Sequence, residues 1–198
     1  GTDNVGIGMN TDFNNQTGSR NTIIGSEAGG GPNTVTRFGN VFIGYRAGYN
    51  EGSSNKLYIA NDSTSSPLIY GDFSNGKMAI GRPGANVTNQ FEVNGGASKS
   101  SAGDWLANSD QRLKKNIQNL KSETALHNLL QMQGVTFEWN DNKTGYKRPE
   151  GMQTGFIAQN LQKVFPENVT EDKLGYLQTA YSTYCLLYTS PSPRDEKV

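Results

Sequence analysis

Hydrophobic positions in the first half of the chain come as short alternating runs, each closed by a glycine. Three runs are copies of one phrase: Asn4-Val5-Gly6-Ile7-Gly8, Asn21-Thr22-Ile23-Ile24-Gly25 and Asn40-Val41-Phe42-Ile43-Gly44. The last two copies continue to an Ala-Gly pair, at 28–29 and at 47–48. Such short strand-and-turn units cannot bury an apolar face alone, so they must stack on one another or on copies from other chains.

Residues 1–52 are therefore expected to form an elongated β-roll or an intertwined trimeric β fibre. A flexible Gly/Asn linker is the alternative, but linkers lack Ile and Val recurring in phase. From 53 to 94 the repeat fades while short β-branched or aromatic runs continue, parted by Gly, Asn, Ser and Pro turns. These runs are Lys56–Ala60, Leu68–Gly71, Lys77–Gly81 and Gln90–Val93. They predict a β-rich neck, and the small residues at 95–103 predict a flexible linker.

The spacing of hydrophobic residues changes in the second half, which predicts a small α+β domain over 104–184. Leu113, Ile117 and Leu120 fall at i, i+4 and i+7 and predict a helix. A second helical stretch opens at Ser122-Glu123, with its leucines at 126, 129 and 130 on one face.

Strands and one more helix are expected in the rest of this domain. Val135, Phe137 and Trp139 alternate, which predicts a strand that places both aromatic rings in a sheet core. After a polar loop at 141–151, a strand is expected at 154–157 and a last strand at 174–181. A short helix is expected between them at 158–164, ending near a proline.

Composition and charge exclude several function classes. The formal net charge of zero removes the electrostatic argument for a nucleic-acid partner or an anionic membrane surface. No apolar run approaches the roughly 18 residues of a membrane span, so no membrane insertion is expected. His127 is the only histidine and has no acidic or thiol partners at ligand spacing, which favours a surface or packing residue over a metal ligand. No cofactor or metal is predicted.

A serine and a lysine lie five positions apart where the globular half begins. Ser109 and Lys114 are the pair that a serine nucleophile with a lysine base requires, if a turn folds them together. Spacing alone is weak evidence, because most such pairs are solvated surface residues.

Three sequence blocks, the first of which contains this pair, occur in the same order as in a known protein family. They are Ser109-Asp110-x-Arg112-Leu113-Lys114-x-Asn116-Ile117, then Gly134-Val135-x-Phe137-x-Trp139, then Gly155-Phe156-Ile157-Ala158-Gln159. Residues 104–184 thereby resemble the intramolecular chaperone domain that ends phage tailspikes, tail fibres and endosialidases. The resemblance implies a homotrimer whose chaperone domain helps a β-rich fibre to fold and then cuts itself off. It assigns the serine–lysine dyad to Ser109 and Lys114. The Gly/Asn phrase resembles the head repeats of trimeric autotransporter adhesins.

The implied mechanism is a single self-cleavage with no external substrate. Lys114 acts as a base only when it is neutral, which burial in a folded trimer and the neighbouring cations Arg112 and Lys115 would favour. Attack by Ser109 on its own carbonyl would need a four-membered ring, so the expected cut is Asn108–Ser109. Asp110 either orients Arg112 or caps the following helix; the cap is favoured.

The C-terminal end departs from the family, which continues into a helix that builds a trimeric coiled coil. Residues 185–195 here resemble, codon for codon, one reading frame of a transposase-type sequencing adapter. Residues 185–198 are thus expected to be an adapter artefact or a disordered tail, and the chaperone domain to be truncated. Under the adapter interpretation, Cys185, the only cysteine, says nothing of the redox compartment.

Two settings remain open for such a chain. The first is a phage tail fibre or tailspike in the virion, with upstream regions binding a host-cell receptor or glycan. The second is a trimeric adhesin at the bacterial cell surface, or a secreted fibre, with the same chaperone domain. An enzyme for external substrates is a distant third, because the repeats hold no polar constellation for catalysis.

Overall fold

The computed structural model describes residues 1–98, 100, 108–140, 147–179 and 184. The chain divides into two compact units, residues 1–97 with 141–147 and residues 98–140 with 148–198. The expectations for 104–107, for the loop at 141–146 and for the tail at 185–198 lie outside the described residues, as do positions 99 and 101–103 of the predicted linker.

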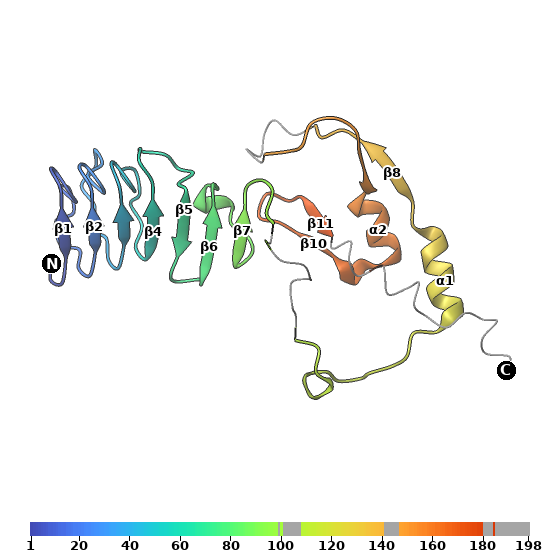
Figure 1. Cartoon of the computed structure of the whole chain (residues 1–198). Coiled ribbons are helices and arrows are strands. Elements are labelled where there is room, and N and C mark those ends of the chain that lie inside the picture. The colour runs from blue at the N-terminus through green and yellow to red at the C-terminus, as the bar shows by residue number, and fades with distance from the viewer. Residues whose placement is uncertain (99, 101–107, 141–146, 180–183, 185–198) are drawn as a thin grey trace. The chain divides into compact units, whose positions relative to one another are not determined.

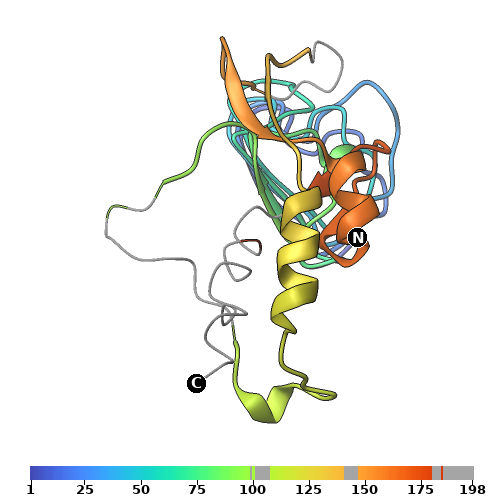
Figure 2. The same ribbon diagram turned by 90° about the vertical axis from the view of Figure 1, so that its right-hand side faces the viewer.

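The first unit is a seven-stranded sheet whose strands follow one another in sequence order (Figure 1). The strands are β1 (Val5–Ile7), β2 (Thr22–Ile24), β3 (Val41–Ile43), β4 (Lys56–Ile59), β5 (Ile69–Asp72), β6 (Lys77–Ile80) and β7 (Phe91–Val93). Strands β1 to β4 pair in parallel, β4 to β6 antiparallel, and β6 and β7 in parallel again. A short 3-10 turn, η1 (Gly84–Asn86), precedes β7. Figure 2 looks nearly along this array, so that its strands overlap in projection. The expected β-rich repeat region is confirmed as a β-solenoid-like array.

The middle residue of each strand points inward and forms the core of the array. Register aligns Ile23, Phe42, Tyr58, Tyr70 and Ala79 in one column, and all five are buried. The rings of Phe42 and Tyr58, and those of Tyr58 and Tyr70, meet edge to face with centroids 5.6 Å apart, a favoured aromatic geometry. Each unit thus buries its apolar residue only against its neighbours, as the phrase predicted.

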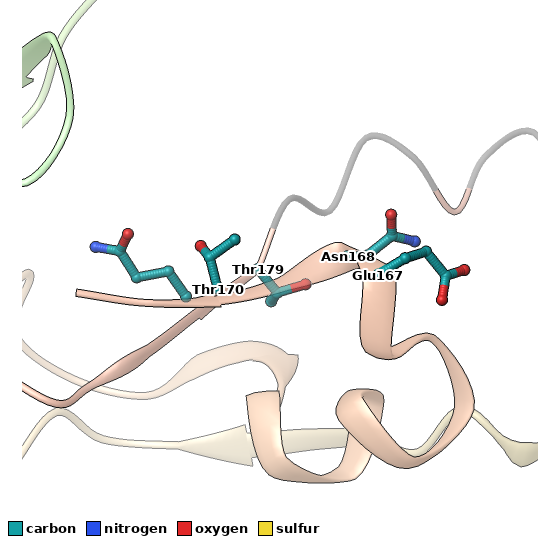
Figure 3. Close-up of a pocket in the computed structure, with 5 residues that line it drawn as sticks. Glu167, Asn168, Thr170 and Thr179 are labelled. Carbon is teal, nitrogen blue, oxygen red and sulfur yellow. The ribbon is translucent and has the colours of Figure 1, made fainter. Parts of the chain in front are cut away.

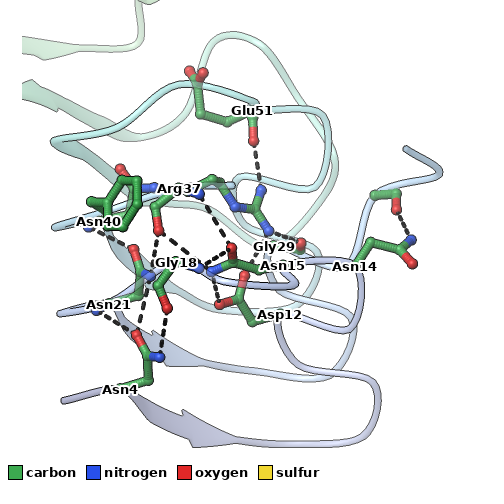
Figure 4. Close-up of polar contacts among 12 residues, drawn as sticks. Asn4, Asp12, Asn14, Asn15, Gly18, Asn21, Gly29, Arg37, Asn40 and Glu51 are labelled. Atoms are coloured by element: carbon green, nitrogen blue, oxygen red, sulfur yellow. Dashed lines mark hydrogen bonds and ion pairs between the residues drawn. The ribbon is translucent and has the colours of Figure 1, made fainter. Parts of the chain in front are cut away.

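The asparagine that opens each phrase connects one strand to the next (Figure 4). Asn21 Oδ1 accepts a hydrogen bond of 3.0 Å from the backbone N–H of Asn40, and Asn40 Oδ1 accepts one of 2.8 Å from that of Lys56. The side-chain amides donate to backbone carbonyls of the turn that follows, just before the next strand, from Asn21 to Arg37 at 2.8 Å and from Asn40 to Ser53 at 3.0 Å. This ladder satisfies buried backbone groups that the short strands leave unpaired.

The glycine that closes each phrase is required by both conformation and space. Gly25 and Gly44 have φ of 138° and 113°, which residues with a Cβ rarely adopt. A Cβ on Gly25 would overlap the backbone of Gly44, and one on Gly44 would overlap the carbonyl of Ala60. Successive units therefore stack backbone on backbone at this corner.

A buried arginine ties three turns of the array together (Figure 4). The Arg37 guanidinium pairs with Asp12 at 2.6 Å, donates to the carbonyl of Glu51 at 2.5 Å, and also donates to the carbonyl of Gly29. It lies 5.5 Å from the centroid of the Phe42 ring. Because its charge is paired and its donors reach turn carbonyls, burial of this cation is tolerated.

The core column ends in a charged pair at β7. Glu92 takes the inward position next to Ala79 and pairs with Arg82, both side chains being buried. Glu92 also accepts the backbone N–H groups of Thr88 and Asn89, at 2.6 Å each. A polar group therefore closes the apolar column at this end.

The second unit contains two α-helices and two short hairpins among its described residues. Its elements are η2 (Gln111–Leu113), α1 (Ser122–Gln131), β8 (Gly134–Phe137), β9 (Gln153–Phe156), α2 (Ala158–Val164), η3 (Pro166–Asn168), β10 (Val169–Glu171) and β11 (Leu177–Thr179). β8 pairs with β9, and β10 with β11, both antiparallel. Leu161, Phe165 and Tyr184 form its buried core, packed against Phe156 and Val169 among others. The expected small α+β domain is confirmed, with α2 at the predicted bounds; β10 was not predicted.

Two expectations for this unit are wrong. The helix expected over Leu113, Ile117 and Leu120 is limited to the 3-10 turn η2, because Asn116 has a φ of 55° and interrupts any helix there. All three apolar residues are exposed. Trp139 lies beyond the end of β8 and is 44% exposed. It lies at the edge of the Phe137 ring and under the Arg148 guanidinium instead of in a sheet core.

Candidate functional site

The structure brings Ser109 and Lys114 together. Lys114 Nζ donates a hydrogen bond of 2.6 Å to Ser109 Oγ. Between them, η2 reverses the chain through hydrogen bonds from Leu113 N to Asp110 O at 3.0 Å and from Lys114 N to Gln111 O at 3.1 Å. One tight turn is thus enough to place the two side chains in contact.

Asp110 and Arg112 hold this turn in place. Asp110 Oδ1 accepts the backbone N–H of Arg112 at 2.8 Å, which caps η2. The same carboxylate accepts Arg112 Nε at 3.0 Å and a terminal guanidinium nitrogen at 2.8 Å. Hydrogen bonds from Arg112 lower the pKa of Asp110, and in turn raise the pKa of the guanidinium. Asp110 therefore fills both roles that the sequence left open, because it caps the turn and orients Arg112.

Arg112 is paired with Asp110, and this pairing weakens the repulsion between Arg112 and Lys114 that the sequence suggested. An arginine whose charge is offset by an adjacent carboxylate repels a nearby ammonium less than a free one does. Burial does not compensate in the single chain, since both Ser109 and Lys114 are exposed. The single chain thus supplies the contact between Ser109 and Lys114 but does not bury it.

The predicted scissile bond lies directly before the turn in the chain. Asn108 is described and exposed, one residue before the serine hydroxyl. Residues 101–107 on its N-terminal side lie outside the described residues. The bond between Asn108 and Ser109 is accordingly within reach of Ser109 Oγ through its own backbone.

Other features of the described residues offer no comparable site. An open pocket of about 390 Å³ beside β10 and β11 is lined by Glu167, Asn168, Thr170, Gln178 and Thr179. Figure 3 shows these side chains spread along the strand instead of converging on one point. Among the described residues there is no group of three or more His, Cys, Asp or Glu side chains placed to hold a metal, and His127 is exposed on α1. None of the described helices has the length and apolar character needed to cross a membrane.

Comparison with known proteins identifies the second part of the chain. No curated protein matches the sequence. Residues 109–170, less than half of the chain, match the model of a peptidase family described as chaperone of endosialidase. The match begins at Ser109, the first residue of the turn. This family implies self-cleaving peptidase activity in general and supports a chaperone role in a trimeric fibre. Residues 109–170 therefore carry the intramolecular chaperone domain of the endosialidase chaperone family.

Proposed function

We propose that this chain is the C-terminal part of a trimeric phage tail fibre or tailspike whose chaperone domain assists folding of the trimer and then cleaves the Asn108–Ser109 bond. The observation that carries this proposal is the 2.6 Å contact between Lys114 Nζ and Ser109 Oγ at the first residue of the family match. Ser109 is the nucleophile and Lys114 its base. The reaction occurs once, within the chain.

The proposed cleavage needs no cofactor. A neutral Lys114 accepts the proton of Ser109 Oγ, and the oxygen attacks the carbonyl carbon of Asn108 through a five-membered ring. The C–N bond breaks, the departing amine of Ser109 takes the proton, and an ester links Asn108 to Ser109 Oγ. Water then hydrolyses the ester, leaving a carboxylate on Asn108 and a free hydroxyl on Ser109.

In this proposal, formation of the trimer switches the cleavage on. In the single chain Ser109 and Lys114 are both exposed to water. Contact with two further copies would remove water from Lys114 and favour its neutral form. Cleavage would therefore follow trimer formation, and an unfolded or solitary chain would stay intact.

Substitution of the dyad in the full-length protein, with the family's coiled-coil helix present, tests the proposal. Wild type is expected to give two pieces on a denaturing gel, with the first ending at Asn108 by mass spectrometry. Ser109→Ala and Lys114→Ala should each stay whole, since the members of a dyad act as a unit and losing either abolishes nearly all of the rate. Lys115→Arg is the matched control, because it changes the neighbouring exposed lysine but keeps its positive charge, and cleavage of this variant should match wild type. Unchanged processing in Ser109→Ala would refute the serine mechanism.

The biological setting is a separate part of the proposal. A phage fibre would be encoded beside tail and baseplate genes and would be present in purified virions, with upstream regions binding the host receptor or glycan. The alternative, a bacterial surface or secreted adhesin, is favoured by the stacked Asn and Gly phrases and would be encoded with a secretion signal and an anchor. Immunolabelling of virions and of the bacterial surface distinguishes these two locations.

A further inference from the structure

The last step of the proposed cleavage calls for water at a place from which water has to be removed. Ser109 and Lys114 are exposed in the single chain, and packing around them in the proposed trimer favours the neutral form of the lysine. The same packing keeps solvent away from the ester that joins Asn108 to Ser109 Oγ. A nucleophile that already belongs to the chain would open this ester without admitting water.

The ester also faces a competing reaction from the amine that its formation releases. The Ser109 amine can attack the ester carbonyl through the same five-membered ring that Ser109 Oγ used, and this attack restores the peptide bond. The return is downhill, because an amide is more stable than an ester. Net cleavage therefore needs a nucleophile that reaches the ester carbonyl as readily as this amine does.

Asn108 carries such a nucleophile in its own side chain. Its amide nitrogen Nδ2 is joined to the Asn108 carbonyl carbon through Cγ, Cβ and Cα, so attack by Nδ2 closes a five-membered ring. The residue is exposed, and Ser109 follows it directly. The connectivity of the chain is thus enough to bring the two reacting atoms together, as a well-placed intramolecular reaction requires.

Asp110 also carries a nucleophilic group near the ester, but its carboxylate is engaged. It accepts the backbone N–H of Arg112 at 2.8 Å and two guanidinium nitrogens of Arg112 at 3.0 and 2.8 Å. Attack by this carboxylate would break charge-assisted hydrogen bonds, which are the strong ones in proteins. The neighbouring amide of Asn108 is therefore the better placed of the two groups.

Lys114 is positioned to move the proton that this attack requires. An amide nitrogen loses a proton when it attacks a carbonyl, and the departing oxygen has to gain one. Lys114 Nζ lies 2.6 Å from Ser109 Oγ, which is the oxygen that departs when the ester opens. One amine in contact with the leaving oxygen can therefore accept the proton from the amide and deliver it to Oγ.

We propose that Asn108 is a second nucleophile of the self-cleavage and opens the ester by cyclisation of its side chain. Nδ2 bonds to the Asn108 carbonyl carbon, the bond from that carbon to Ser109 Oγ breaks, and a proton passes from Nδ2 through Lys114 to Oγ. The first piece then ends in a cyclic imide, which water afterwards opens to a carboxylate and an amide. The proposal rests on the proposed serine–lysine reaction and replaces water only in the step that separates the two pieces.

Mass spectrometry of newly released protein tests the cyclisation. The full-length chain, with the family's coiled-coil helix present, is made by cell-free synthesis, and samples are quenched in dilute acid to preserve the imide. The earliest fragment ending at Asn108 should be lighter by about 18 Da, one water, than the fragment with a carboxylate. It should gain this mass on incubation at mildly alkaline pH. A fragment that carries the carboxylate from its first appearance overturns the proposal.

Two variants measure what the side chain of Asn108 contributes to the rate. Asn108→Ala removes the amide and should slow release by at least about tenfold, with the fragment at its full carboxylate mass. Asn108→Gln is the matched control, because it keeps an amide at the same exposed position but would have to close a six-membered ring. Its release should be slowed as well, whereas a merely polar role of the amide would leave it unchanged. Release at the wild-type rate from either variant overturns the proposal.

Ser109→Ala separates this proposal from the serine–lysine dyad. The variant should stay whole, because without Oγ no ester forms for Asn108 to open. A carboxylate-ending wild-type fragment together with an intact Ser109→Ala chain would reject the cyclisation and keep the dyad. Release of the lighter fragment from Ser109→Ala would reject the dyad and leave Asn108 as the nucleophile.

Discussion

Replacing Asn21 by alanine is expected to destabilise the first unit strongly. Asn21 is 1% exposed and makes three side-chain hydrogen bonds. Its Oδ1 accepts from Asn40 N at 3.0 Å, and its Nδ2 donates to Arg37 O at 2.8 Å and to Asn4 Oδ1 at 3.1 Å. Alanine removes all three bonds and leaves the surrounding backbone where the sheet holds it.

The cost follows from the groups left without partners. Asn40 is fully buried, so its N–H would have neither protein nor water to donate to. Arg37 O would keep a single long contact of 3.5 Å with Asn15 Nδ2. A buried polar group without a partner costs about 1–3 kcal/mol, so the two together predict a loss of roughly 2–5 kcal/mol. A carboxylate in Asn21→Asp could not donate at all and would bury a charge, so that variant should be worse still.

Urea unfolding of the full chain, followed by far-ultraviolet dichroism, measures this loss. Both tryptophans, Trp105 and Trp139, fall outside residues 1–97 in the sequence, so their fluorescence should not change with this substitution. Asn50→Ala is the control, because Asn50 is an exposed asparagine of the same unit whose side chain donates an exposed hydrogen bond of 3.3 Å to the Ser63 carbonyl. Water can replace this bond, and its loss should cost less than about 1 kcal/mol. Equal losses for Asn21→Ala and Asn50→Ala would refute the ladder as a source of stability.

Three further substitutions test the array. Phe42→Ala removes the central buried ring and should cost about 3–5 kcal/mol in the same unfolding assay. Gly44→Ala combines φ strain with overlap at Ala60 O and should lose at least about 2 kcal/mol; a neutral result would contradict the stacked corner. Burial raises the pKa of Asp72, but the hydrogen bonds from Asn75 and Lys56, together with the charge of Lys56, outweigh burial and lower the pKa. Its contribution is therefore present above the unfolded pKa and lost as pH falls below about 4. Asp72→Asn should flatten that part of the stability profile measured by urea unfolding.

Local sequence signals predicted the strands well because each strand depends on its own alternation. In the phrases around Ile23 and Phe42, the alternation predicted which residue points inward, and the glycine after each phrase predicted where the strand ends. The role of the opening asparagines was missed, although their recurrence in phase with the strands was the available signal.

In the second unit, the spacing of hydrophobic residues predicted one helix that does not form. Leu113, Ile117 and Leu120 have helical spacing, yet the left-handed conformation of Asn116 interrupts the segment, and all three side chains are exposed. The contact between Ser109 and Lys114 could be anticipated because it spans only one turn. The exposure of Lys114 could not, because it depends on what packs over the turn and not on residue spacing.

The buried pair of Glu92 and Arg82 gives the array a fixed end. The units at β2 and β3 each present an apolar inward residue, an asparagine and a glycine corner to the next strand, so units of this kind are interchangeable cassettes. Duplication or loss of a whole cassette would change the length of the array without redesigning either neighbour. The charged terminus cannot accept another cassette, because a following apolar residue would have to pack against a buried ion pair. Addition of cassettes is thus confined to the N-terminal side of β7, and the sequence after β7 can stay constant while the length of the array varies.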